Sequence, residues 1–248
     1  MKDIEYNGEF GYEMIGVVPY AYYLFKNKQL NSTTSSIDTQ CFYFFSINHN
    51  EIYDKRVYRD LSGFPFTSLH SKTPNFEQWE PPPYKEFFRN SELLFPKPIY
   101  IISNKYNDEW GRGPINFLPT DVLMEICLKL KDQYQIIYNR PETSVKDNSK
   151  IFNLNEKESL KSIGVKILED IPHSSFNELQ CKIFANCENF ISVQGGGSIL
   201  SSYFGGQNKI FAIEGGEIDC GSYNNWYNKL SNCEVSVYSD YKSLIESL

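Results

Sequence analysis

Apolar and polar residues follow two alternating patterns along the second half of the chain. Short apolar runs, such as 99–103 (IYIIS) and 189–193 (NFISV), are typical of strands buried on both faces. Between them, apolar residues recur every third or fourth position, as in 120–130, where Thr120 is the expected N-cap of an amphipathic helix. The strands are expected at 99–103, 134–138, 165–168, 189–193 and 209–213, and the helices at 120–130, 156–163, 176–185 and 198–204. This alternation predicts a parallel sheet with right-handed crossovers.

The first half of the chain begins in the same order but loses its regularity. A strand at 4–6, a glycine-containing turn at 8–11 and a helix interrupted by Pro19 are expected. The polar run 31–36 predicts a loop, and the aromatic run 40–47 (QCFYFFSI) predicts a strand. Beyond residue 49 only a short helix at 84–90 stands out, directly after the prolines at 81–83.

Together these patterns predict an α/β fold with two Rossmann-like domains, of which the N-terminal one is reduced. Residues 1–97 would form a smaller, less regular lobe, and residues 98–248 the regular domain. The irregular, proline-containing stretch before residue 98 would connect the two.

Composition and charge exclude several classes of protein. The chain has 248 residues, of which 41% are hydrophobic, and this excludes a disordered chain. A net charge of −7 argues against a partner held through a phosphate backbone, so no nucleic acid is expected. No apolar run is long enough to span a bilayer, and acidic residues at Asp3, Glu5 and Glu9 do not fit a signal peptide. We therefore expect a cytoplasmic protein.

Cysteine and histidine are too dispersed to suggest metal or triad chemistry. The six cysteines have no CxxC spacing, and they are expected to be reduced and mostly buried. The three histidines, at positions 49, 70 and 173, are expected to be ordinary surface or loop residues. No metal site and no resident cofactor are predicted.

A glycine-rich turn follows the strand at 189–193. Gly195, Gly196 and Gly197 let a ligand approach the backbone closely, and Ser198 stands where the next helix begins, where free amides attract phosphate. The spacing matches neither GxGxxG nor GxxxxGK[ST], so a dinucleotide site and a P-loop are not indicated. A turn without any ligand is the alternative.

The loop Gly8 to Glu13 (GEFGYE) lies between the first strand and the first helix. Ligands of open α/β sheets bind beyond the carboxyl ends of strands, where this loop is expected. Glu9 is the preferred general base and Glu13 the second catalytic candidate, because a partly desolvated carboxylate can accept a proton from a hydroxyl. Alternatively, both carboxylates only favour the positive end of the helix.

Further candidates follow other strands of the predicted sheet. Asn104, Lys105 and Arg112 come after the strand at 99–103, and a cation there could neutralise a diphosphate leaving group. Arg140 offers another cation after the next strand, and Glu214 offers a carboxylate for ribose hydroxyls. Gln194, just before the glycine turn, completes the expected donor-binding set. Solvated loops are the alternative for most of these side chains.

Two of these motifs resemble segments of GT-B glycosyltransferases, in which two Rossmann-like domains face each other across a nucleotide-sugar cleft. GEFGYE (8–13) is similar to the N-terminal loop of bacterial and viral polysaccharide glycosyltransferases. FISVQGGGSILSSYFGG (190–206) is similar to the donor-phosphate turn of fucosyltransferase-like and xylosyltransferase-like families. The resemblance implies that residues 195–198 contact a diphosphate and that Glu9 lies near the acceptor, with Gly8, Gly11 and Tyr12 on the acceptor side.

The sequence thus predicts a hexosyl- or pentosyltransferase for polysaccharide biosynthesis. It would transfer a sugar from a nucleoside diphosphate sugar, the co-substrate, to a hydroxyl of a glycan or lipid-linked glycan. Asp108 and Glu109 are the nearest acidic pair and form no DxD motif, so metal-independent transfer is expected. The alternatives are a polysaccharide pyruvyl transferase-like enzyme, an epimerase or hydrolase of sugar nucleotides, and a non-catalytic protein that binds carbohydrate or nucleotide.

Overall fold

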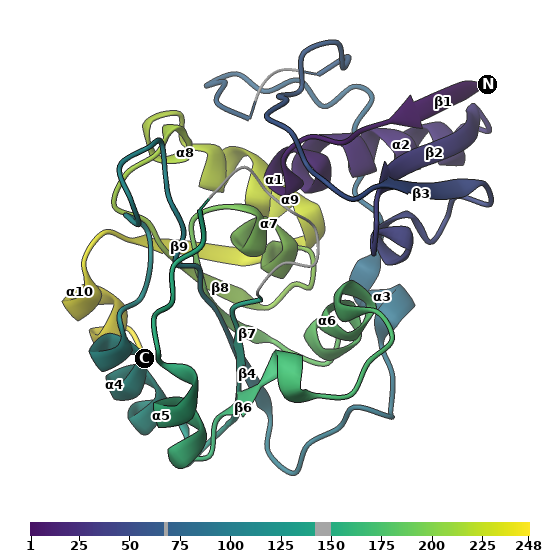
Figure 1. Cartoon of the computed structure of the whole chain (residues 1–248). Coiled ribbons are helices and arrows are strands. Elements are labelled where there is room, and N and C mark those ends of the chain that lie inside the picture. The colour runs from purple at the N-terminus through teal and green to yellow at the C-terminus, as the bar shows by residue number, and fades with distance from the viewer. Residues whose placement is uncertain (67–68, 142–149) are drawn as a thin grey trace.

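The computed structural model of the chain describes residues 1–66, 69–141 and 150–248 and contains two parallel sheets (Figure 1). The small sheet has the order β1-β2-β3, and the large sheet has the order β6-β5-β4-β7-β8-β9. The strands are β1 (Lys2–Glu5), β2 (Leu30–Ser36), β3 (His49–Tyr53), β4 (Ile99–Ser103), β5 (Gln135–Asn139), β6 (Lys166–Ile167), β7 (Asn189–Val193), β8 (Gln207–Phe211) and β9 (Glu234–Tyr238). Within both sheets, neighbouring strands pair in parallel. The predicted parallel α/β architecture is therefore confirmed.

The strand order of the large sheet reverses between β4 and β7. From β4 the chain proceeds outward through β5 to β6, and from β7 it proceeds in the other direction through β8 to β9. Ser103 and Ser192 lie opposite each other across the β4–β7 pair. In open α/β sheets, the crevice beyond the carboxyl ends of such a pair is the usual ligand site.

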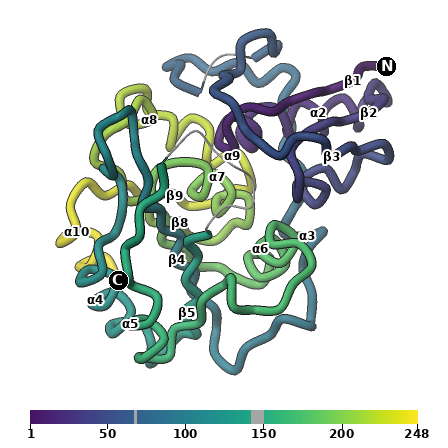
Figure 2. Tube along the Cα trace, viewed as in Figure 1, coloured from purple at the N-terminus to yellow at the C-terminus, as the bar shows by residue number. Residues whose placement is uncertain are grey.

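Helices cover both faces of the large sheet. One core cluster joins the sheet to α4 (Thr120–Leu130), α5 (Lys157–Ser162) and α10 (Tyr241–Glu246). The other cluster joins it to α6 (Phe176–Phe184), α7 (Gly196–Ser202) and α9 (Asn228–Ser231), and continues into the N-terminal lobe. Figure 2 shows this lobe, in purple and blue, beside α7 and α9. The strands of the small sheet precede residue 97 and those of the large sheet follow it, but both sheets pack on this core.

The first helix of the chain contains a π-helical turn that accommodates Pro19. The segment runs as α1 (Phe10–Tyr12), a π-helix (Glu13–Val17) and α2 (Val18–Lys26). Proline has no N–H, so carbonyls one turn earlier lose a donor. Two side chains replace it: the Tyr203 hydroxyl donates to Met14 O at 2.6 Å, and Trp79 Nε1 donates to Ile15 O at 2.6 Å. The helix predicted for this segment is confirmed.

Two predicted segments of the N-terminal lobe have another secondary structure, and β3 was not predicted at all. The expected loop 31–36 is β2, the central strand of the small sheet. It is polar because its buried hydroxyls have partners inside the lobe: Thr33 Oγ1 donates to Ser46 Oγ at 2.8 Å, and Ser35 Oγ donates to Glu13. The expected strand 40–47 begins instead as a 3₁₀ helix (Gln40–Tyr43). A short aromatic run has no periodicity that distinguishes the two.

The remaining elements complete the lobe and the large domain. The predicted helix after the proline run is α3 (Tyr84–Phe88). The structure also contains a 3₁₀ turn (Leu168–Asp170), α8 (Gly216–Asp219) and a π-helix (Tyr223–Tyr227), none of which the sequence pattern predicted. The N-cap of α4 is Pro119 and not Thr120, whose hydroxyl donates to Leu154 O.

Candidate functional site

A lysine lies against the glycine turn at the point where the strand order reverses. Lys105 follows β4 and Gly195 follows β7, so both lie beyond the carboxyl ends of the central pair. A Cβ atom built on Gly195 would be 3.5 Å from Lys105 Nζ. Gly195 has φ +123°, a conformation that favours glycine. The structure thus brings together the cation and the turn that the sequence assigned to a diphosphate.

A buried carboxylate holds this lysine in place. Glu109 Oε2 lies 2.8 Å from Lys105 Nζ, while Glu109 Oε1 accepts from the backbone N–H of Asn116 at 2.7 Å. Asn116 Oδ1 in turn accepts from the N–H of Ile213 at 2.7 Å, in the loop after β8. These bonds fix Lys105 and the loops after β4 and β8 in one arrangement, so the cation is positioned before any ligand arrives.

The glycine turn offers backbone N–H groups to a ligand, and not the side chain of Ser198. Ser198 is buried, and both its N–H (3.0 Å) and its hydroxyl (2.7 Å) donate to Gly195 O. The Ser198 hydroxyl closes the turn, so the diphosphate contact predicted for residue 198 would not involve this hydroxyl. Gly196 and Gly197 occupy the first turn of α7, where N–H groups have no acceptor within the helix.

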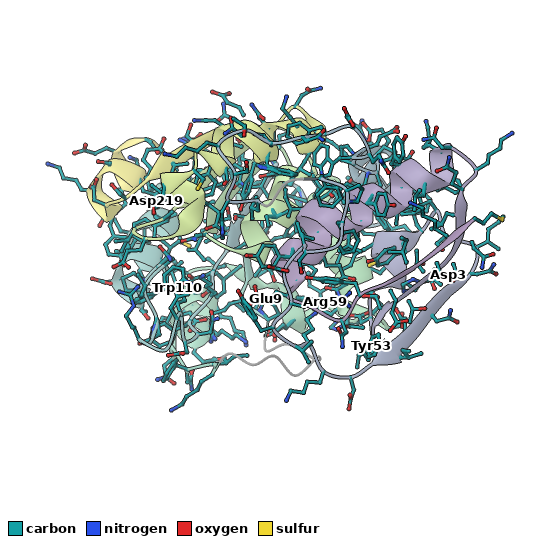
Figure 3. All side chains as sticks on the ribbon, turned by 90° about the horizontal axis from the view of Figure 1, so that it is seen from above. Asp3, Glu9, Tyr53, Arg59, Trp110 and Asp219 are labelled. Carbon is teal, nitrogen blue, oxygen red and sulfur yellow. The ribbon has the colours of Figure 1, made fainter. Side chains whose placement is uncertain are left out.

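The two sequence motifs meet at this turn. A Cβ on Gly196 would lie 2.5 Å from Phe10 Cδ1 and 3.2 Å from Gly11 N, so α1 packs directly on α7. Glycine at position 196 is thus required by this close approach, whether or not a ligand binds here. Glu9 immediately precedes α1, and Figure 3 shows it between Trp110 and Arg59. Phe10 and Gly11 of the first motif are consequently in direct contact with the glycine turn.

The acceptor-side residues of the loop have separate positions. Gly8 is buried in a tight turn, since a Cβ there would lie 2.4 Å from the Tyr6 hydroxyl. Tyr12 is half-buried, and its ring lies 6.4 Å from that of His70, centroid to centroid. Burial raises the pKa of Tyr12 to about 12, so its hydroxyl stays protonated at neutral pH.

Glu13 does not lie at the glycine turn. Its carboxylate is fully buried in the N-terminal lobe, where Arg56 Nη2 lies 2.6 Å from Oε2 and the Tyr43 hydroxyl donates to Oε1 at 2.8 Å. The catalytic role predicted for Glu13 is therefore wrong. Arg56 also donates to Gly8 O at 2.8 Å, so this ion pair supports the loop that carries Glu9.

Arg140 and Asn104 are also structural. Arg140 is buried and paired with Glu156, with Nε 2.6 Å from Oε1. Asn104 is buried and bonds Leu118 twice, donating to its O at 2.9 Å and accepting from its N at 3.0 Å. The donor-binding roles predicted for both side chains are wrong, because these contacts enclose their polar groups.

Arg112 and Glu214 remain at the surface, on the rim of the site. They form an ion pair of 2.7 Å, and more than two-fifths of each side chain is exposed. The pair joins the loops after β4 and β8. An exposed ion pair of this kind contributes little to stability, so either group can exchange its partner for a ligand at small cost.

A histidine that the sequence did not single out completes the surface. The buried Glu217 carboxylate lies 3.6 Å from His70 Nε2 and accepts from Gln194 Nε2 at 2.6 Å. A Cβ on Gly215 would lie 1.9 Å from Gln194 Nε2, so glycine there makes room for this network. Gln194 is thus a buried support and not an exposed donor ligand. The only signal in the sequence was the glycine pair 215–216 after a strand.

The structure contains a separate cavity of about 730 Å³ between the end of β2 and the start of α6. Its lining includes Asp38, Phe44, Phe87 and Phe176, and none of the residues around the glycine turn that are described above. Asp38 O accepts from Asn177 Nδ2 at 2.6 Å, which joins the lobe to α6 beside this cavity.

Two further properties hold for residues 1–66, 69–141 and 150–248. No group of three or more His, Cys, Asp or Glu side chains in these ranges could hold a metal ion. None of their helices combines the length and the apolar character needed to cross a membrane. Their cysteines are free, and all but Cys220 are buried, as the sequence predicts.

Comparison with known proteins identifies the fold. No protein family model and no curated protein matches the sequence. Among solved structures, the E. coli ADP-heptose lipopolysaccharide heptosyltransferase II matches with a TM-score of 0.59 and 11% identity, over 99% of this chain and 94% of that one. The chain has the fold of that heptosyltransferase. It is thus a mixed α/β protein with parallel sheets.

A second solved structure is similar only in part. The wall teichoic acid polymerase TagF has a TM-score of 0.39 and 12% identity, over 91% of this chain and 50% of that one. The narrower likeness to fucosyltransferase-like and xylosyltransferase-like families remains a prediction from the sequence motifs.

Proposed function

We propose that the protein is a glycosyltransferase that moves a sugar from a nucleoside diphosphate sugar to a hydroxyl of a glycan acceptor. One observation carries this proposal: Lys105 Nζ lies over the Gly195 turn, beyond the carboxyl ends of the strand pair at which the sheet order reverses. A fixed cation beside the amides of a helix start suits the phosphates of a nucleotide sugar. The likeness of the fold to a heptosyltransferase supports the same class.

In the proposed reaction, the acceptor oxygen forms a bond to the anomeric carbon while the bond from that carbon to the diphosphate oxygen breaks. The electron pair of the broken bond leaves on the diphosphate. Lys105 stabilises this negative charge, which is the task a divalent metal has in other enzymes, and metal-independent transfer is therefore part of the proposal. The acceptor would lie beside Gly11 and Tyr12, opposite the glycine turn.

The test is a thermal-shift and activity panel. UDP, GDP, CDP, ADP and CMP are added to the protein with and without magnesium, since a ligand that binds only the native state raises Tm. We expect one diphosphate to raise Tm without metal, and its sugar nucleotides to release that diphosphate only when an acceptor glycan is present. Diphosphate release that a chelator abolishes would contradict metal independence.

Other outcomes of this panel would identify another function. Conversion of the sugar nucleotide without release of diphosphate would indicate an epimerase, and tight binding without turnover over a range of acceptors would indicate a binding protein. Absence of any shift with the five nucleotides would favour a pyruvyl transferase-like enzyme.

Glu9 is the proposed base for the acceptor hydroxyl. The residue is partly exposed and directly precedes α1, which packs on the glycine turn that Lys105 contacts. We expect Glu9→Gln to lower kcat by about 10²- to 10⁴-fold, because the amide cannot accept the proton. The variant should remain folded, with a Tm close to that of the wild type.

The matched control is Glu5→Gln, which removes an exposed carboxylate of β1. It should keep full turnover. Normal turnover of a folded Glu9→Gln variant would show that another group accepts the proton.

A further inference from the structure

An exposed tryptophan lies beside the proposed diphosphate site. Trp110 directly follows Glu109, the buried residue whose carboxylate holds Lys105 Nζ at 2.8 Å. Because consecutive Cα atoms are only about 3.8 Å apart, the tryptophan is fixed near the lysine that contacts the glycine turn. Trp110 is nevertheless 57% exposed. This position offers an aromatic surface to a ligand whose phosphates lie at Lys105.

The backbone of Trp110 has a conformation that is unfavourable for a large side chain. Its φ is +53°, in the left-handed region that glycine and asparagine adopt more readily than bulky residues do. Asp108 closes the loop around it, since its Oδ2 accepts from Gly111 N at 3.1 Å and its Oδ1 from Gly113 N at 2.7 Å. Burial in the core does not compensate for the strain, because Trp110 is exposed. Strained residues of this kind cluster at sites that bind ligands.

A second contact supports the tryptophan ring. The guanidinium of Arg112 lies over the ring, with Cζ 5.5 Å from the centroid. Arg112 is in turn paired with Glu214 in the loop after β8. One guanidinium covers only one face of an indole, and the exposure of Trp110 shows that the ring remains accessible elsewhere. A flat group can therefore stack on a ring that is already held in place.

The position of Trp110 favours a nucleobase over the acceptor sugar. The acceptor is expected beside Gly11 and Tyr12 of the N-terminal lobe, whereas Trp110 belongs to the loop after β4 of the large domain. Figure 3 shows Trp110 and Arg59, a residue of the lobe, on opposite sides of Glu9. In a nucleotide sugar, the nucleoside extends from the diphosphate on the side away from the transferred sugar. The base is thus the part of the donor that Trp110 suits.

We propose that Trp110 is the aromatic platform of the donor site, on which the base of the nucleoside diphosphate stacks. This assignment rests on the proposed function, because it assumes that Lys105 binds the phosphates. Arg112 is a positioning residue that supports the ring, and Asp108 is a positioning residue that fixes the loop. Every base has a π-face, so the stack contributes affinity without selecting one base.

The test compares ligands with and without a base. UDP, GDP, CDP, ADP and inorganic pyrophosphate are each titrated calorimetrically into the wild type and Trp110→Asn. Asparagine adopts the left-handed conformation readily, so the loop should keep its shape and Tm should not fall. We expect Trp110→Asn to weaken the nucleoside diphosphate that binds by about tenfold, as for the loss of one stack between a base and an aromatic side chain. The affinity for pyrophosphate should not change.

Two other variants separate the stack from the phosphate contact. Lys105→Met is the matched variant with the opposite pattern, since it should weaken pyrophosphate and the nucleoside diphosphate alike. Trp110→Phe keeps an aromatic ring and should retain most of the affinity for the nucleoside diphosphate.

Tryptophan fluorescence gives an independent measurement. Of the three tryptophans of the chain, Trp79 and Trp226 are buried and Trp110 is exposed. We expect the nucleoside diphosphate to quench the fluorescence of the wild type, and pyrophosphate to leave it unchanged. The quenching should disappear in Trp110→Asn, which a purely structural role of Trp110 would not predict.

Different results would overturn the role of Trp110 and the diphosphate site itself. Equal affinity of wild type and Trp110→Asn for the nucleoside diphosphate would overturn the stack and leave the phosphate site intact. An equal loss for pyrophosphate would also overturn it, because the variant would then have disturbed the site of Lys105. A higher KM for the acceptor with unchanged nucleotide affinity would assign Trp110 to the acceptor instead. If neither pyrophosphate nor any of the four nucleoside diphosphates binds the wild type, both proposals fail.

Discussion

Lys105→Met should lower kcat for sugar transfer by about 10²- to 10³-fold, the usual effect of removing one fixed donor from a site of developing negative charge. The Nζ atom lies 3.5 Å from a Cβ atom built on Gly195. In the proposed reaction the departing diphosphate gains its negative charge beside this turn. The affinity for the free diphosphate should also fall, because Lys105 would contact the phosphates of the bound ligand as well as those of the departing group. Steady-state kinetics and calorimetry on the same preparations measure both effects.

Arg112→Met is the matched comparison for Lys105→Met. Both are cations of the loop after β4, but Arg112 is paired with Glu214 at the rim and is largely exposed. Its removal should change kcat by much less. A loss of equal size in the two variants would contradict the assignment of Lys105 as the diphosphate cation. Lys105→Arg, which keeps the charge, should recover part of the activity.

Arg56→Met should destabilise the protein by about 3–5 kcal/mol, because it leaves the fully buried carboxylate of Glu13 without its counter-charge. The Tyr43 and Ser35 hydroxyls still donate to Glu13, but they bring no positive charge. Arg56 also donates to Gly8 O, so turnover should fall as the loop carrying Glu9 loses its support. Chemical denaturation gives the free energy of unfolding.

The double variant Glu13→Gln/Arg56→Met distinguishes an unpaired charge from lost packing. It should be more stable than Arg56→Met alone, since no buried charge remains. Lys242→Met, which removes one member of an exposed pair 3.8 Å apart, should leave the unfolding midpoint unchanged. If the double variant is no more stable than Arg56→Met, the loss of stability comes from lost packing and not from an unpaired charge.

Much of the large domain could be predicted because its strands are short and buried on both faces. β4 and β7 have the bounds that the apolar runs indicate. The small sheet could not be predicted in the same way. β2 is polar because its hydroxyls bond other buried groups, including Glu13, and such partners lie far away in the sequence.

The candidate site could be located by its loops, but only in part by its side chains. Glu9 and Glu13 belong to one motif, yet the first is partly exposed and the second is enclosed by the N-terminal lobe. Lys105 and Arg140 both follow strands and both pair with a buried carboxylate, yet Arg140 is itself buried while about a quarter of the Lys105 side chain is exposed. Nothing in local sequence distinguishes these cases, because burial depends on which segments pack against the loop.

By itself, the sequence determined the parallel α/β architecture and the positions of its glycine turns. These features follow from local chemistry: apolar runs that must be buried on both faces, and backbone conformations that glycine adopts readily. Only the tertiary structure decided which polar side chains are buried and which stay partly exposed. His70 reaches Gly216 because the N-terminal lobe packs against the helices of the large sheet, and Lys105 lies over Gly195 because β4 pairs with β7. Contacts between segments distant in the chain depend on the packing of the whole core, which no local pattern encodes.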